Sequence, residues 1–180
     1  LYYALIGWMD HEIGQGIKAV DGSHQRDNTI IIYLSDHGEN KGDHYLWWKN
    51  CMYEHATRIP LIFRWPKRWE GGQVRHGPCS TLDVVQTILD LAGAESRDNW
   101  DGDSMVSWLD DRDAGWKDLA VSEYYAHNIC SGFSMIRKGT PAFFRRIPIK
   151  RPDIPAPITH TSNPDFSVIP CLPYRDPIKA

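Results

Sequence analysis

The chain has 180 residues, of which 42% are apolar, and its formal net charge is −3. This composition suits a globular domain with a hydrophobic core, and no basic tract with interleaved aromatics indicates a nucleic-acid-binding surface. No apolar run reaches the length of a membrane span, and the first residues lack the pattern of a signal peptide.

An amphipathic helix is predicted over residues 1–20. Apolar residues recur there at helical intervals, from Leu5 to Val20, which predicts a helix laid on a sheet. The chain begins without methionine and inside this pattern, so we expect that an upstream segment is missing and leave the cellular compartment open.

A buried strand is predicted over residues 29–34, because this run is apolar on both faces. Asp36 and His37 follow its carboxyl end, where open α/β sheets commonly hold their functional groups. A carboxylate and an imidazole together suit a divalent cation such as Ca, Mn or Zn. Neighbouring residues of a strand point to opposite faces, so both reach one ion only if the chain turns, which Gly38 permits. Alternatively, Asp36 is a helix cap and His37 an ordinary surface histidine.

The loop over residues 39–50 is polar and then aromatic, and it ends near Lys49. This lysine could fold back toward Asp36 and meet an anionic substrate as a compact positive charge, or it could be an ordinary surface lysine. Glu54, His55 and Arg58 follow as a charged trio, either supporting a metal site or forming a structural salt bridge.

Further elements are predicted from apolar periodicity and turn chemistry. They are a helical turn over 51–55, a buried strand over 61–65, a helix over 84–91 with a capping box from Ser80 to Asp83, a short helix before residue 110, and two strands over 119–125 and 134–137. The two last strands are expected to form a hairpin, and Asp83 is expected to be a cap instead of a metal ligand.

The last forty residues hold nine of the twelve prolines. Proline disfavours both regular helices and central strands, so residues 140–180 are predicted to be an irregular Pro-rich tail. The four cysteines are widely spaced, without a Cys-x-x-Cys pair, and are expected to be mostly free or buried thiols.

Four blocks resemble, in order and spacing, the sulfatase family of the alkaline phosphatase superfamily; they lie at residues 35–39, 42–49, 53–55 and 58–62. The resemblance extends over residues 1–139, which would be the carboxyl-terminal part of a catalytic domain. It implies part of an alkaline-phosphatase-like α/β sandwich, with a mostly parallel sheet flanked by helices.

The resemblance also implies sulfate ester hydrolysis, with Asp36 and His37 as ligands of one divalent metal ion, Ca before Mn or Zn. Lys49 would contact a sulfate oxygen, and His44 would donate to a leaving-group or sulfate oxygen unless it only caps the loop. The substrate would be a small-molecule or glycan sulfate ester, and the oligomeric state stays open.

The family's nucleophile is a formylglycine made from cysteine or serine. Cys51, Cys79 and Cys130 are not followed by Pro or Ala and then Arg, as the nucleophile motif requires. The nucleophile is therefore expected upstream, and the isolated chain is expected to be inactive. The alternatives are a phosphodiesterase or phosphonate monoester hydrolase of the same superfamily, and a non-catalytic module that binds an anion or metal.

Overall fold

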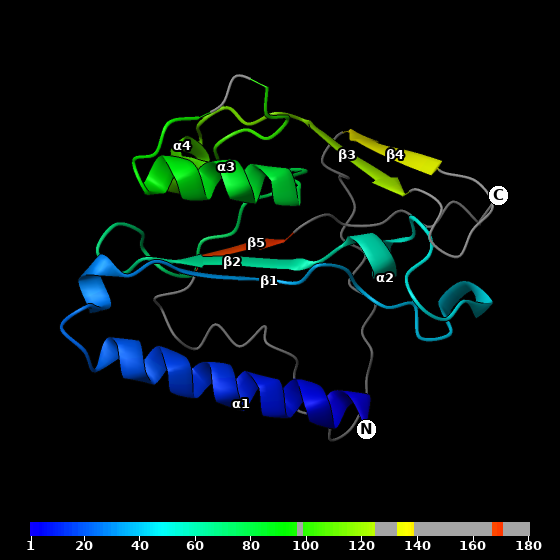
Figure 1. Ribbon diagram of the computed structural model, residues 1–180, viewed down its shortest axis with the longest axis horizontal. Coiled ribbons are helices and arrows are strands. Elements are labelled where there is room, and N and C mark those ends of the chain that lie inside the picture. The colour runs from blue at the N-terminus through cyan, green and yellow to red at the C-terminus, as the bar shows by residue number, and fades with distance from the viewer. Residues whose placement is uncertain (97–98, 125–132, 139–166, 171–180) are drawn as a thin grey trace. The chain divides into compact units, whose positions relative to one another are not determined.

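The computed structural model describes residues 1–96, 99–124, 133–138 and 167–170, the last only as a strand (Figure 1). The helices and strands are α1 (Tyr2–Asp21), β1 (Ile31–Leu34), α2 (Glu54–Thr57), β2 (Pro60–Arg64), α3 (Thr81–Leu91), α4 (Val106–Asp110), β3 (Leu119–Tyr124), β4 (Phe133–Lys138) and β5 (Ser167–Pro170). Strand β2 lies between β1 and β5 in one sheet, while β3 and β4 form a second. The chain is thus a partial α/β domain, as predicted.

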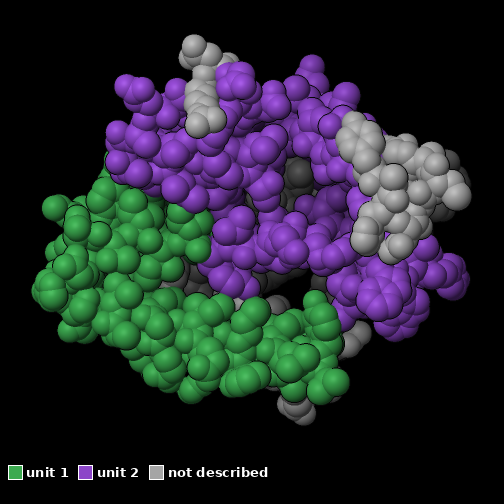
Figure 2. All heavy atoms as spheres, in the orientation of Figure 1, with its two compact units in different colours: residues 1–32, 62–73, 145–168 green, residues 33–61, 74–144, 169–180 purple. Residues whose placement is uncertain are grey.

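The chain divides into two compact units that interleave along the sequence (Figure 2). The first contains residues 1–32, 62–73 and 145–168. In it, helix α1 has the predicted extent, but none of its residues is buried and Trp8 is 65% exposed. Among the residues that the structure describes, the expected packing of this helix on a sheet is not found. Its last residue does hold the unit together, because Asp21 accepts a 2.7 Å hydrogen bond from the buried guanidinium of Arg64.

The prediction of a strand buried on both faces is wrong for β1 and right for β2. The residues of β1 are half-buried and Leu34 is exposed, whereas β2 is buried from Leu61 to Arg64. An apolar run is buried only where other elements cover both of its faces. Strand β1 stands at one end of the strand order and its faces stay partly open among the described residues.

The second unit contains residues 33–61, 74–144 and 169–180. Its helix α3 begins with the predicted capping box, in which the Ser80 backbone N–H donates to the Asp83 carboxylate at 2.7 Å. Asp83 is fully buried, and it also accepts hydrogen bonds from the Asp103 backbone and the Lys117 ammonium. Burial alone would lower the pKa of Lys117, but its hydrogen bonds to Asp103 and Asp83 outweigh this effect and raise it. Asp83 is therefore a cap, as predicted, and also the anchor of a loop.

Strands β3 and β4 pair antiparallel, as predicted, with Leu119 opposite Lys138 and Tyr124 opposite Phe133. Along β3, exposed residues alternate with half-buried ones. This period of two gives β3 one open face and one covered face.

Strand β5 lies within residues 140–180, where an irregular tail was predicted, and the rest of that stretch lies outside the described residues. Each compact unit contains residues from both sides of position 139. In the part of the chain that the structure describes, no helix is long and apolar enough to cross a membrane.

Candidate functional site

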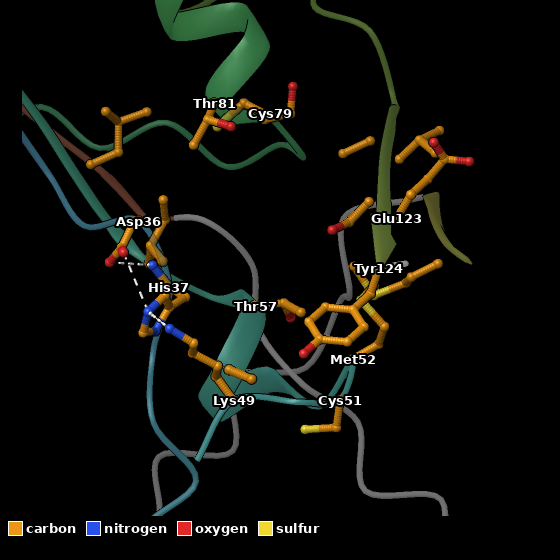
Figure 3. A pocket seen from close by; sticks show the side chains of 18 of the residues that line it. Asp36, His37, Lys49, Cys51, Met52, Thr57, Cys79, Thr81, Glu123 and Tyr124 are labelled. Carbon is orange, nitrogen blue, oxygen red and sulfur yellow. Dashed lines mark hydrogen bonds and ion pairs between the residues drawn. The ribbon is translucent and has the colours of Figure 1, made fainter. Parts of the chain in front are cut away.

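A cavity of about 300 Å³ lies in the second unit (Figure 3). The loop after β1 lines it with Asp36 and His37, and the segment that leads to α2 contributes Lys49. Strand β3 forms a further wall. The structure therefore brings together three of the four side chains predicted to act in the site.

Asp36 follows β1 at a bend, and its carboxylate turns back toward its neighbour. One oxygen accepts the His37 backbone N–H at 2.9 Å, and the other lies 3.3 Å from His37 Nε2. The backbone N–H of His37 is the main cause that lowers the pKa of Asp36, and the charge of Lys49 acts in the same direction. The carboxylate is thus held in its ionised form, which is the form that binds a cation.

His37 presents one defined ring nitrogen to the cavity. Its Nδ1 lies 2.8 Å from the carbonyl oxygen of Gly38, which can only accept, so Nδ1 carries the proton. Nε2 is then the acceptor, and the ammonium of Lys49 lies 2.5 Å from it (Figure 3). The lone pair of Nε2 is therefore already directed at a positive charge.

Gly38 is required here by a close approach of two backbones. Its N–H donates to the carbonyl of Ala56 at 2.8 Å, and a Cβ at this position would lie 1.9 Å from the carbonyl oxygen of His55. Its φ is not among the positive values. The glycine thus docks the Asp36–His37 bend onto α2, which differs from the predicted reason, an unusual turn.

The loop from Glu39 to Lys49 is closed on itself by Asn40. This residue is 2% exposed, and both its backbone N–H and its side-chain amide donate to the carbonyl of Trp48, at 3.1 and 2.5 Å. The carboxylate of Glu39 accepts the Trp48 N–H at 2.6 Å. These bonds return the chain to the cavity immediately before Lys49.

The same loop contains four non-glycine residues with positive φ, which L-residues adopt at a cost. They are Lys41, His44, Tyr45 and Trp48. Because Asn40 and Glu39 hold the two ends of the loop together, its middle is forced into tight turns. Of these four residues, Trp48 immediately precedes Lys49, which lines the cavity.

His44 is not among the residues that line this cavity. It stacks on Tyr53 with ring centroids 4.1 Å apart, and it lines a different cavity, of about 310 Å³, with Glu54, His55 and Arg58. The structure therefore does not bring His44 to Lys49, although they are only five positions apart in sequence.

Two members of the charged trio before β2 pair with residues outside the trio. Glu54 pairs with Arg137 of β4 at 2.7 Å, and both side chains are largely buried. His55 lies 2.7 Å from the carboxylate of Asp43. Of the two predicted roles for this trio, the structure shows structural pairing, which ties α2 to β4 and to the loop.

Two residues of the site were not predicted. Asn40 is a single polar residue in a polar loop, and no local pattern marks it as buried. Tyr124 lines the cavity from the end of β3. The predicted strand over 119–125 contains it, but a strand prediction does not say which face meets the site.

Asp36 and His37 fit a divalent cation as an oxygen donor and a nitrogen donor on one side of the cavity. Among the described residues, no group of three or more His, Cys, Asp and Glu side chains is arranged to hold a metal ion. A metal bound here would therefore need further ligands besides this pair. Cys51 has a free thiol near Asn40 and Cys79 is buried, as expected, while Cys130 and Cys171 lie outside the described residues.

Comparison with known proteins gives consistent similarities. The sulfatase family model matches residues 1–94. An N-acetylglucosamine-6-O-sulfatase of Bacteroides thetaiotaomicron is 33% identical over 129 residues, which are 70% of this chain and 23% of that protein. The chain spans about a quarter of the length of the curated relatives it matches.

Two solved structures are similar with a TM-score of 0.65 each. One is a protein in complex with its substrate D-glucosamine-2-N,6-O-disulfate; it is 32% identical, and 72% of this chain aligns with 27% of it. The other is a phosphonate monoester hydrolase from Silicibacter pomeroyi, 28% identical, where 72% of this chain aligns with 28% of it.

Proposed function

The chain belongs to the sulfatase family, and from this premise we propose that it supplies the metal-binding and sulfate-binding side of a site that hydrolyses sulfate esters. The observation that carries the proposal is the convergence of Asp36, His37 and Lys49 in one cavity. His37 and Lys49 are twelve positions apart in sequence, and only folding brings them together.

Asp36 and His37 would hold one divalent metal ion, calcium before manganese or zinc. Such an ion supplies electrostatic stabilisation of the charge that develops on the ester oxygens. The bond from Nδ1 of His37 to the Gly38 carbonyl keeps Nε2 available as a ligand, and the low pKa of Asp36 keeps its carboxylate ionised.

Lys49 would bind an oxygen of the sulfate group. Its ammonium already lies beside Nε2 of His37, and its flexible side chain lets the ammonium turn from this nitrogen to an incoming oxyanion. Because the loop behind Lys49 is closed by Asn40, its backbone is fixed in position while its side chain adjusts. His44, which lies on a different cavity, has no role in this proposal.

The bond-making group would come from outside the described residues. Cys51, Cys79 and Cys130 are not in a formylglycine motif. Cys171, which lies outside the described residues, has Pro173 and Arg175 at the spacing of that motif, but the chain corresponds to only about a quarter of its relatives. The chain alone is then expected to bind the metal ion and sulfate without turning over an ester.

A second candidate is the hydrolysis of a phosphonate or phosphate ester. The similarity to the phosphonate monoester hydrolase favours it, because a lysine beside a metal ion held by a carboxylate and an imidazole suits any tetrahedral oxyanion. A protein that joins this chain to an upstream nucleophile motif should separate the two candidates. Faster turnover of 4-nitrophenyl sulfate than of phenyl phosphonate supports the first, and the reverse supports the second.

Binding tests the site without the nucleophile. We expect calcium to bind the 180-residue chain in a calorimetric titration and sulfate to bind its calcium-loaded form. Asp36→Asn should weaken calcium binding, and Lys49→Ala should weaken sulfate binding about tenfold, while Lys67→Ala, on another surface loop, serves as the matched control. Sulfate binding that is equally strong in the wild type and in Lys49→Ala would refute the assignment.

A further inference from the structure

The wall of the cavity that β3 contributes has no role in the proposal above. Ala120, Ser122 and Tyr124 all line the cavity and are the half-buried residues of that strand. Residues two apart on a strand share a face, so these three side chains stand in a row. Two small side chains leave space in front of the strand, and Tyr124 ends the row with a large one.

The ring of Tyr124 reaches into the space between β3 and α2. Figure 3 shows it projecting from the strand toward Thr57 and the side of the cavity that carries Lys49. The ring thus stands apart from the Asp36–His37 pair, at a place where the remainder of an ester would lie once its sulfate meets Lys49.

The lining of the cavity as a whole combines hydroxyl groups with apolar side chains, and it also includes Glu123. Five of the lining residues bear hydroxyls, namely Thr57, Ser80, Thr81, Ser122 and Tyr124. Apolar lining comes from both sides of the cavity, with Met52 near α2 and Met135 on β4. A volume of about 300 Å³ is at the lower end of small-molecule pockets and has room for one ring with its sulfate.

We propose that Tyr124 is a specificity-determining residue, which seats the alcohol part of the sulfate ester as a single polyhydroxylated ring, such as a hexose. The apolar face of a hexose stacks on an aromatic ring, and its hydroxyls pair with the hydroxyl side chains of the cavity. This inference rests on the proposed function, because it takes the sulfate of the same ester to be held by Lys49.

The test compares two ligands, inorganic sulfate and glucose 6-sulfate, in calorimetric titrations of the calcium-loaded chain. We expect glucose 6-sulfate to bind more tightly than sulfate. Tyr124→Leu should lower the affinity for glucose 6-sulfate about five- to tenfold and leave the affinity for inorganic sulfate unchanged. Tyr124→Phe keeps the ring and should retain most of the affinity. Leu119→Ala, an exposed position of β3 outside the cavity lining, is the matched control.

A measurement on the wild type covers the case in which Tyr124→Leu fails to fold. In NMR spectra with selectively labelled tyrosine, glucose 6-sulfate should shift the ring signals of Tyr124 and inorganic sulfate should not. The inference is overturned if both ligands shift them alike, or if Tyr124→Leu weakens both ligands equally or neither. It is also overturned if phenyl sulfate binds as tightly as glucose 6-sulfate, because hydroxyls would then contribute nothing.

These results separate the inference from the proposed function. A wild-type chain that binds inorganic sulfate through Lys49 but shows no preference for glucose 6-sulfate overturns the inference alone. A chain that binds neither ligand refutes the sulfate site, and the inference falls with it.

Discussion

The replacement Asn40→Ala should loosen the loop that positions Lys49. Asn40 is almost fully buried, and its side-chain amide lies 2.5 Å from the Trp48 carbonyl and 3.2 Å from the Cys51 sulfur. The Trp48 carbonyl keeps its bond from the Asn40 backbone N–H at 3.1 Å, so no acceptor is left without a donor. The loss is therefore the side-chain hydrogen bond to Trp48, the weaker contact with the Cys51 sulfur and a small cavity, and we expect the free energy of unfolding to fall by about 1–2 kcal/mol.

The functional effect follows from the strain in that loop. Four residues with positive φ stay in place only while the ends of the loop are held together, so a weaker closure lets Lys49 move away from the cavity. We expect sulfate affinity to fall about three- to tenfold, or about 0.7–1.4 kcal/mol. Urea denaturation gives the first quantity and calorimetric titration the second.

Two variants serve as controls for this replacement. Asn40→Asp has the same shape but cannot donate to the Trp48 carbonyl, so it should destabilise the chain more than Asn40→Ala. Asn50→Ala, in the same loop but less buried, should change stability by less than about 0.5 kcal/mol. The reasoning is refuted if Asn40→Ala unfolds at the wild-type urea concentration, or if it loses stability yet binds sulfate with unchanged affinity.

Three other predictions follow from the same contacts. Gly38→Ala should cost more than about 2 kcal/mol in urea denaturation, since its Cβ would meet a backbone oxygen, whereas Gly14→Ala, with open space in α1, should be stabilising; equal effects would contradict this. Burial alone would lower the pKa of Lys117, but its hydrogen bonds to Asp103 and Asp83 raise it above the ordinary value of 10.5. The contribution of Lys117 to stability is therefore complete below pH 10.5 and is lost as the pH rises through the pKa of the folded state. Denaturation between pH 9 and 12 should therefore show a decline that Lys117→Met reduces, and an unchanged decline would count against this account. A double-mutant cycle of Glu54→Gln and Arg137→Met should give a coupling of about 1–3 kcal/mol, and additive effects would show that the pair is not coupled.

Local signals in the sequence were sufficient for several elements. The capping box at Ser80 and Asp83 and the apolar run before Pro66 each act over a few neighbouring residues, so they form wherever that segment folds. The set of Asp36, His37 and Lys49 was predicted only because the order of several blocks resembled a family, since spacing alone left each of them an ordinary surface residue.

Contacts between distant segments decided the remainder. The apolar run of β1 predicted a fully buried strand. What covers a strand depends on elements elsewhere in the chain, and the faces of β1 stay partly open among the described residues. His44 and Lys49 belong to one loop, yet because of the tight turns of that loop their side chains line different cavities. Whether Tyr124 faces the cavity depends on how β3 is placed, which no pattern within the strand encodes.

The sequence by itself therefore determined which groups are available for chemistry and which short segments are helices or strands. Only the tertiary structure decided which of these groups meet, because a hydrogen bond such as that from Asn40 to Trp48 depends on the path of the whole loop. The requirement for Gly38 is of the same kind, since it comes from the carbonyl of His55, seventeen positions later. Propensity is a property of a few neighbouring residues, whereas a site is a property of the space that distant residues share.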